Sequence, residues 1–243
     1  MTVYSIPGFA EPFNSILHLF AAVFFSVLAF FLVARGRGST GRMFSLAVFA
    51  FSAVFLLSMS GVYHLLSMGG TGRLVLQRLD HAAIFLLIAG SFTPLHFIMF
   101  TGFWRWGILA LIWAITIAGI ALKVIYFDSI PEWLSLSVYL GLGWLGLLSG
   151  LLLARRFGIS FINPLVLSGL AYSLGGITEY FRWPVIIPGV IGPHELFHVA
   201  VIAGIGFQWY FINQCLDKTE ELEHEHEQTV TDGQRDQSDC QTD

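Results

Sequence analysis

The sequence predicts an all-α membrane protein built as a bundle of seven transmembrane helices. Composition is the first reason: 56% of the residues are hydrophobic, 12% are charged and the mean hydropathy is +0.73. Soluble domains carry about 25% charged residues. The second reason is that seven apolar stretches reach the length of about 20 residues that a helix needs to cross a bilayer. The third is that most of the ionisable residues inside these stretches fall at one membrane face, whereas His96 and Arg105 lie at the other.

The predicted helices follow one another with short connections. They cover residues 14–34, 44–68, 79–100, 103–123, 133–153, 161–181 and 193–213. Long apolar runs without the alternation of a strand favour helices in each case. The fifth and sixth stretches are rich in Gly and Ser, which is typical of membrane helices that pack closely. Because the connections are short, we expect one compact domain over 14–213, preceded by a short N-terminal segment, 1–13.

The C-terminal segment, 214–243, has a different composition. Residues 217–243 contain ten acidic and two basic side chains. A polar, acidic segment without apolar periodicity is typical of disorder, so we expect a disordered tail. The two cysteines, Cys215 and Cys240, form neither a disulfide framework nor a zinc motif. The charge balance gives no support for nucleic-acid binding.

Polar residues gather in one leaflet of the predicted bundle. Successive helices alternate in direction, so the end of an even helix and the start of the next odd helix lie at the same face. The polar residues at that face are Asn14, His18, Ser60, His64, Asp80, His81, Glu179, His194 and His198. An ionisable residue inside a membrane helix costs roughly 2.5–3.5 kcal/mol, so it needs a partner or a function.

Three of these histidines suit a zinc ion. His194 and His198 are four residues apart and therefore share one helix face. Together with His64 they would provide the three protein ligands of a catalytic zinc, whose fourth position holds water. Asp80 would hold or activate that water, and Ser60 would hydrogen-bond nearby. The sequence thus predicts an intramembrane zinc site, with zinc as the cofactor.

The run from His194 to His198 also matches the HExxH pattern of zinc proteases, in which Glu195 would be the general base. An intramembrane metalloprotease needs a further carboxylate ligand, usually from an Asp-Gly motif in another helix. The one Asp-Gly pair here, Asp232-Gly233, lies in the tail. This counts against a protease.

Several motifs resemble the hemolysin III branch of the progestin and adipoQ receptor family. They are the stretches Glu11 to His18, Ser60 to His64, Asp80 to Pro94, Leu134 to Tyr139, Tyr172 to Gly175 and His194 to His198. The resemblance covers about residues 11–213. It implies a seven-helix bundle with a buried zinc, ligated by His64, His194 and His198, with Asp80 holding the water and Ser60 nearby. It gives Glu195 no role.

The wider superfamily includes alkaline ceramidases, so the resemblance implies zinc-dependent hydrolysis of lipid amide or ester bonds, with membrane lipids as substrates or ligands. Two other classes remain open beside the protease. One is a non-catalytic receptor or regulator of membrane lipids with structural zinc, and the other is a hemolysin III-type cytolysin. The expected location is the cytoplasmic membrane, as a multi-pass protein, and the oligomeric state is open.

Charge and resemblance predict opposite orientations in the membrane. Near the helix ends, four basic residues lie on the side of the N-terminus and seven on the other, namely Arg73, Arg78, Lys123 and Arg182 against Arg35, Arg37, Arg42, Arg105, Arg155, Arg156 and Lys218. The positive-inside rule then places the N-terminus outside. The resemblance implies the reverse, with the N-terminus and the zinc toward the cytoplasm, and we favour that orientation.

Overall fold

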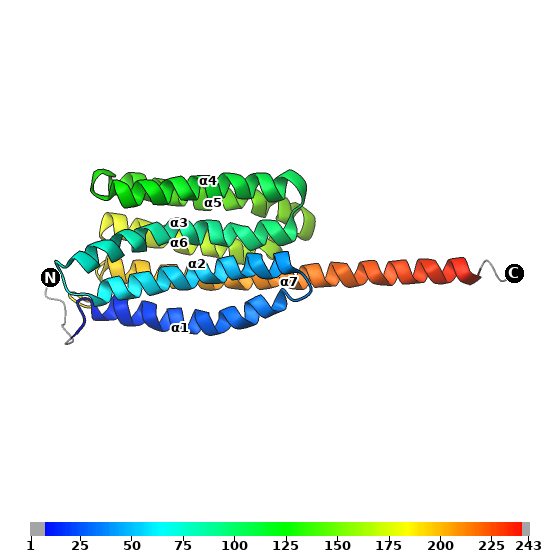
Figure 1. Ribbon diagram of the computed structural model, residues 1–243, viewed down its shortest axis with the longest axis horizontal. Coiled ribbons are helices and arrows are strands. Elements are labelled where there is room, and N and C mark those ends of the chain that lie inside the picture. Colours follow the sequence, from blue (N-terminus) through cyan, green and yellow to red (C-terminus); the bar gives the residue numbers. More distant parts are fainter. Residues whose placement is uncertain (1–7, 240–243) are drawn as a thin grey trace.

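The computed structural model describes residues 8–239, with side chains up to residue 231. It contains seven long helices, each long and apolar enough to cross a membrane (Figure 1). Their bounds are α1 Pro12–Arg35, α2 Thr40–Leu65, α3 Thr71–Met99, α4 Gly102–Ile125, α5 Glu132–Phe157, α6 Asn163–Phe181 and α7 Pro193–Asp239. Two short 3₁₀ helices, Phe127–Ser129 and Ile159–Ile162, precede α5 and α6. Within the described residues there is no β-strand, which confirms the all-α prediction.

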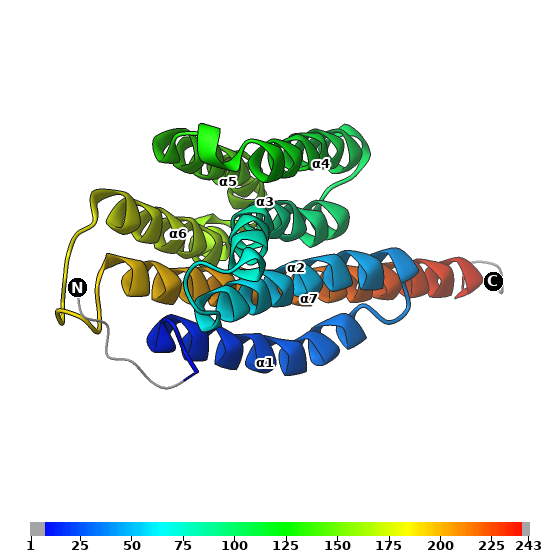
Figure 2. The ribbon, with the colours of Figure 1, turned by 60° about the vertical axis from the view of Figure 1, so that its left-hand side comes forward.

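The helices form successive layers across the bundle. Helix α1 lies on one side, α2 and α7 come next, then α3 and α6, and α4 and α5 lie on the other side (Figure 2). The largest apolar core lies between α1, α2, α3 and α7, around Phe49, Ile205 and Trp209. Many large apolar side chains face outward instead, such as Phe20 and Phe30. Such an exterior suits a lipid environment and not water.

Small residues let helices approach closely near the polar end of the bundle. A Cβ added at Gly61 of α2 would lie 2.7 Å from the side chain of Leu19 on α1. A Cβ at Gly175 of α6 would lie 2.7 Å from that of Ala200 on α7. Contacts of this kind are typical of membrane helices, where close packing replaces the hydrophobic effect. They bring α1, α2, α6 and α7 together around the histidines.

Helix α3 begins earlier than predicted, at Thr71 and not at residue 79. The added two turns contain Arg73 and Arg78, which a hydropathy window excludes. Their charges are tolerated here because both guanidinium groups have partners: Arg73 bonds to Glu11 and Arg78 to the Val124 carbonyl. The polar start of α3 therefore belongs to the folded bundle, and it contributes to the site described below.

The C-terminal segment begins as a continuation of α7, while residues 240–243 of the expected tail and 1–7 of the expected N-terminal segment lie outside the described residues. Helix α7 continues through residues 214–239 and projects beyond the bundle (Figure 1). Two reasons explain its helical state. The residues after Asp217 are rich in Glu, with Lys and Gln, which have good helix propensity. Ion pairs also tie its first turns to the bundle, since Arg35 contacts Asp217 at 2.6 Å and Arg42 contacts Glu223 at 2.6 Å.

Candidate metal centre

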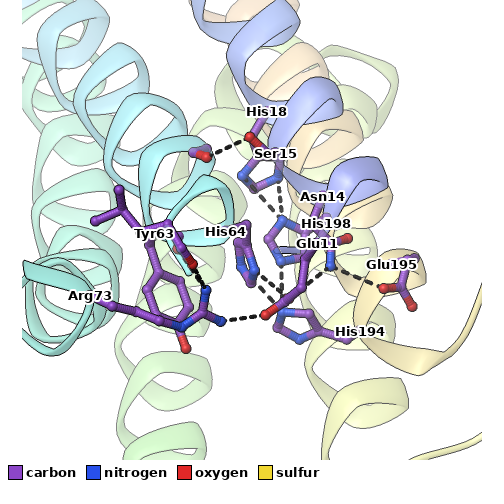
Figure 3. Close-up of polar contacts among 12 residues, drawn as sticks. Glu11, Asn14, Ser15, His18, Tyr63, His64, Arg73, His194, Glu195 and His198 are labelled. Carbon is purple, nitrogen blue, oxygen red and sulfur yellow. Dashed lines mark hydrogen bonds and ion pairs between the residues drawn. The ribbon is translucent and has the colours of Figure 1, made fainter. Parts of the chain in front are cut away.

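Three histidine nitrogens converge between α2 and α7 (Figure 3). The Nε2 atom of His194 lies 3.3 Å from Nε2 of His64 and 3.0 Å from Nε2 of His198. One ligand atom from each of the three residues lies within 4.8 Å of the others. His64 and His198 are buried and His194 is half-buried. The structure thus brings together the three histidines that the sequence singled out.

Each of the three histidines binds a separate partner through its other ring nitrogen. Nδ1 of His64 lies 2.6 Å from Glu11 Oε2, and Nδ1 of His194 lies 3.3 Å from Glu179 Oε1. Nδ1 of His198 lies 2.8 Å from Nε2 of His18. Because an ionised carboxylate can only accept hydrogen bonds, it holds the histidine proton on Nδ1 and leaves the Nε2 lone pair free. This pattern is typical of histidines that bind metals.

Glu11 lies at the centre of a charged network before α1. Its carboxylate bonds to His64 and to the guanidinium of Arg73. This guanidinium also donates a 3.1 Å hydrogen bond to the Tyr63 carbonyl (Figure 3). The Arg73 guanidinium stacks 4.5 Å above the Tyr63 ring. Partial burial raises the pKa of Glu11, but the contacts with His64 and Arg73 outweigh it and lower this pKa to about 2. The carboxylate is therefore ionised at neutral pH.

Asp80 and Ser60 line a cavity beside the histidines. Asp80 is on α3, Ser60 lies beside its carboxyl on α2, and His194 and His198 line the same cavity. The two residues predicted to act on the water are therefore near the histidine cluster. Neither Asp80 nor Ser60 belongs to the three-histidine cluster that could hold a metal ion.

The cavity extends from this polar end into the bundle. Its volume is about 300 Å³, and its lining, mainly from α3, α5, α6 and α7, is mostly apolar. On α3 it runs from Asp80 to Leu95, and at its far end it reaches Leu165 and Val166. Fifteen residues of helix span about 22 Å. This exceeds the depth of one hydrocarbon leaflet, about 15 Å. Charged groups, Lys123, Glu132 and Arg182, line the end near the histidines.

Glu195 is directed away from the histidine nitrogens. Its Oε1 accepts a hydrogen bond of 3.0 Å from Asn14, and its Oε2 accepts one of 2.9 Å from the backbone N–H of Gly192 (Figure 3). The second contact caps the start of α7, and the first joins α7 to α1. This is the geometry of a helix-capping residue. It supports the interpretation that the HExxH match is incidental.

Sequence reasoning missed two members of the site and gave partial signals for two others. Glu11 appeared within a motif but without a role, and Arg73 lay outside the predicted helix. His18 and Glu179 were placed at the correct membrane face, but their pairing with particular histidines could not be read from the sequence. His81, at the same face, contacts the Gln77 carbonyl at 2.9 Å through Nδ1 and is not among the converging histidines.

The donor set fits a zinc ion. Zn–N distances of about 2.0–2.1 Å in a tetrahedral arrangement separate two ligand nitrogens by about 3.3 Å. The two Nε2 separations, 3.3 and 3.0 Å, are close to this value. Three neutral imidazoles are also the donor set of well-known catalytic zinc sites. His64, His194 and His198 are therefore the residues that could hold the ion.

Comparison with known proteins agrees with these features. A sequence model of the family described as "Haemolysin-III related" matches residues 9–209. The chain is 26% identical over 201 residues to "Hemolysin-3" of Bacillus cereus, covering 82% of this chain and 88% of that protein. It is 28% identical over 188 residues to "Hemolysin-3 homolog" of Bacillus subtilis (strain 168), covering 76% and 84%. The chain therefore belongs to the haemolysin-III related family, the hemolysin III branch of the progestin and adipoQ receptor family, and is a multi-pass integral membrane protein.

Proposed function

We propose that this protein is a zinc-dependent hydrolase of lipid amide or ester bonds in the plasma membrane. One observation carries the proposal: three histidine Nε2 atoms converge at the polar end of an apolar cavity that Asp80 also lines. The cluster among the described residues contains three ligands, whereas a structural zinc site is normally closed by four. This favours catalysis over the alternative of a receptor with structural zinc.

The residues of the chain divide the chemistry among them. A zinc ion bound by His64, His194 and His198 would supply Lewis-acid activation of a water molecule and of an acyl carbonyl. Asp80 would hold the attacking water, take its proton and pass it to the leaving amine or alcohol. Ser60, beside the Asp80 carboxyl, would orient that carboxyl by hydrogen bonding.

The cavity suits a lipid with a long acyl chain. Its volume of about 300 Å³ falls at the lower end of the range for ligand sites, about 300–1,000 Å³. The apolar part would hold the chain between Leu95 and Val166, and the reacting bond would lie near Asp80. The charged groups at the same end, among them Lys123 and Arg182, would face the lipid headgroup.

The name of the relatives raises a second candidate, a cytolysin that forms a pore. A conducting path needs polar groups through both leaflets. In this bundle the end opposite the histidines is filled by an apolar cluster from α3, α5, α7 and the 3₁₀ helix before α6, with Leu95, Met99, Leu153, Ile162 and Phe211 among its members. This packing favours a hydrolase over a pore.

The test is direct hydrolysis by the purified, zinc-loaded protein in lipid vesicles. We would offer a panel of N-acyl and O-acyl lipids and measure the released fatty acid by mass spectrometry in water enriched in ¹⁸O. Hydrolysis predicts one ¹⁸O atom in each released acid, and the Asp80→Asn variant should lose that release. Wild-type protein that carries zinc but releases no acid from any lipid of the panel would contradict the proposal.

A further inference from the structure

We propose that Glu11, held by Arg73, is a positioning residue that fixes His64 for metal binding. This inference rests on the proposed metal site and adds a role for the segment before the first membrane helix. Nothing in the HExxH pattern or in the histidine spacing points to it. It follows from how Glu11 and Arg73 surround the end of α2.

His64 needs such support because of its place in α2. The helix ends at Leu65, so His64 is its penultimate residue. Terminal helical turns fray, since their last carbonyl groups lack partners within the helix. His198 lies more than one turn inside α7. His194, the second residue of α7, lies at a helix start that Glu195 caps through the Gly192 N–H. The position of His64 therefore depends on contacts from segments outside α2.

Glu11 holds both the main chain and the side chain of His64. Its backbone N–H donates a 3.0 Å hydrogen bond to the His64 carbonyl, and the N–H of Ala10 donates one of 3.2 Å to the Leu65 carbonyl. Its carboxylate Oε2 lies 2.6 Å from Nδ1 of His64. The backbone contact sets the position of the residue and the carboxylate contact sets the ring. Together they leave the imidazole one orientation, with Nε2 toward His194.

Arg73 completes this support from α3. One of its nitrogens bonds to Glu11 Oε1, and another donates to the carbonyls of Tyr63 and Leu66, on either side of His64. Arg73 is buried, with 7% of its surface exposed. A buried guanidinium in this position neutralises the carboxylate and fixes its plane, since the planar group presents donors in a rigid fork. The network therefore links the residue before α1, the end of α2 and the start of α3.

The contact to His64 is also the tightest of the three. Glu11 lies 2.6 Å from its histidine, whereas Glu179 lies 3.3 Å from His194 and itself pairs with the exposed Arg182. Charge-assisted hydrogen bonds are strongest when short. Glu11 should thus contribute more to metal affinity than Glu179.

The experiment measures zinc affinity of the full-length protein in detergent by competition with a chromophoric chelator. Glu11→Gln should weaken zinc binding about 10–100-fold, the usual cost of losing such a partner. It should also alter the absorption spectrum of the Co²⁺-substituted protein. The metal-free variant should still fold, because the Gln amide oxygen can accept from Arg73, but its unfolding temperature should fall somewhat as the buried guanidinium loses its counter-charge. The matched control is Asp128→Asn, a carboxylate on the same side that is paired with Arg78 at 3.5 Å and exposed, and it should bind zinc like wild type.

A double-mutant cycle separates positioning from general damage. In a His64→Ala background, Glu11→Gln should have no further effect on the residual affinity, because its target is gone. Arg73→Gln is the second variant, and it should weaken zinc binding in the same direction. Wild-type affinity in Glu11→Gln, an equal loss in the His64→Ala background, or failure of both Glu11→Gln and Arg73→Gln to fold would overturn the inference. A wild-type protein that binds no zinc would overturn the proposed function as well. Failure of the inference alone leaves zinc binding by the wild-type protein intact, so the two failures are distinguishable.

Discussion

His64 on α2 and His194 on α7 are 130 positions apart in the sequence, and their Nε2 atoms lie 3.3 Å apart in the structure. With Glu11 and Glu179 beside their Nδ1 atoms, the two imidazoles can each carry the proton on Nδ1 and present the Nε2 lone pairs to one point. A metal ion is the natural occupant of such a point. Loss of any one donor should therefore be measurable as loss of metal.

Replacing His64, His194 or His198 singly by Ala should remove most of the zinc from the purified protein. Three ligands leave no spare donor, so each loss reduces the site to two. Metal content by mass spectrometry is the measurement. The control is His224→Ala, an exposed histidine of the tail, which should keep the wild-type zinc content. Full zinc content in His64→Ala would exclude the proposed site.

Asp80→Asn should abolish turnover, whereas Glu195→Gln should reduce it only mildly. Asp80 lines the cavity beside the histidines, but Glu195 bonds to Asn14 and to the start of α7. Both variants should keep their zinc, since neither residue is a ligand. The measurement is fatty acid release per zinc-loaded protein. If Glu195→Gln were the more damaging change, the protease interpretation of the HExxH pattern would return.

Gly143→Leu should reduce turnover of long-chain lipids roughly tenfold or more, the cost of excess methylene groups in a fitted pocket. Gly143 lines the cavity, and a Cβ added there meets no atom within 4 Å. The side chain would therefore enter open space without disturbing the bundle. Gly141→Leu is the matched control, because Gly141 lies on the same helix, also has an open Cβ position and does not line the cavity. Equal effects of the two substitutions would argue against a chain-binding cavity.

Truncation after Glu223 should leave the thermal unfolding temperature and the zinc content unchanged. The ion pairs of α7 with Arg35 and Arg42 involve Asp217, Glu220 and Glu223, which such a protein keeps. Truncation after Leu216 should lower stability slightly, since exposed ion pairs contribute about 0.2–1 kcal/mol each. Adding Arg35→Gln to that shorter protein should then cost less than in the full-length protein, since of these contacts only the Arg35 bond to Asn213 remains to be lost. A large loss of zinc after either truncation would show that the tail supports the site.

A cysteine at Gly70 should be protected from an impermeant maleimide in intact cells, whereas one at Thr40 should be labelled. Both positions are exposed, and they lie at opposite ends of α2 and its neighbours. The native Cys215 and Cys240 are first replaced by Ala. This outcome would place the histidines toward the cytoplasm, as family resemblance implies. Efficient labelling at Gly70 would instead follow the positive-inside count and place them toward the outside.

The sequence by itself determined the seven helices, because crossing a bilayer demands long apolar segments that hydropathy detects. It also determined which face carries the polar residues, since helix direction alternates. The pairing of His194 with His198 followed from helical spacing alone. Because helix direction and helical spacing follow from the sequence, residue type and position were enough to name the three candidate histidine ligands and Asp80.

Only the tertiary structure decided which polar groups meet. Glu11 and Arg73 lie outside the apolar segments, so hydropathy could not include them, and their contacts with His64 depend on how the ends of α1, α2 and α3 pack. The start of the acidic segment shows the same limit, since its ion pairs with Arg35 and Arg42 could not be read from composition. Hydropathy reports the partition of a segment between lipid and water, whereas hydrogen bonds and ion pairs depend on distances between segments, which only the folded bundle defines.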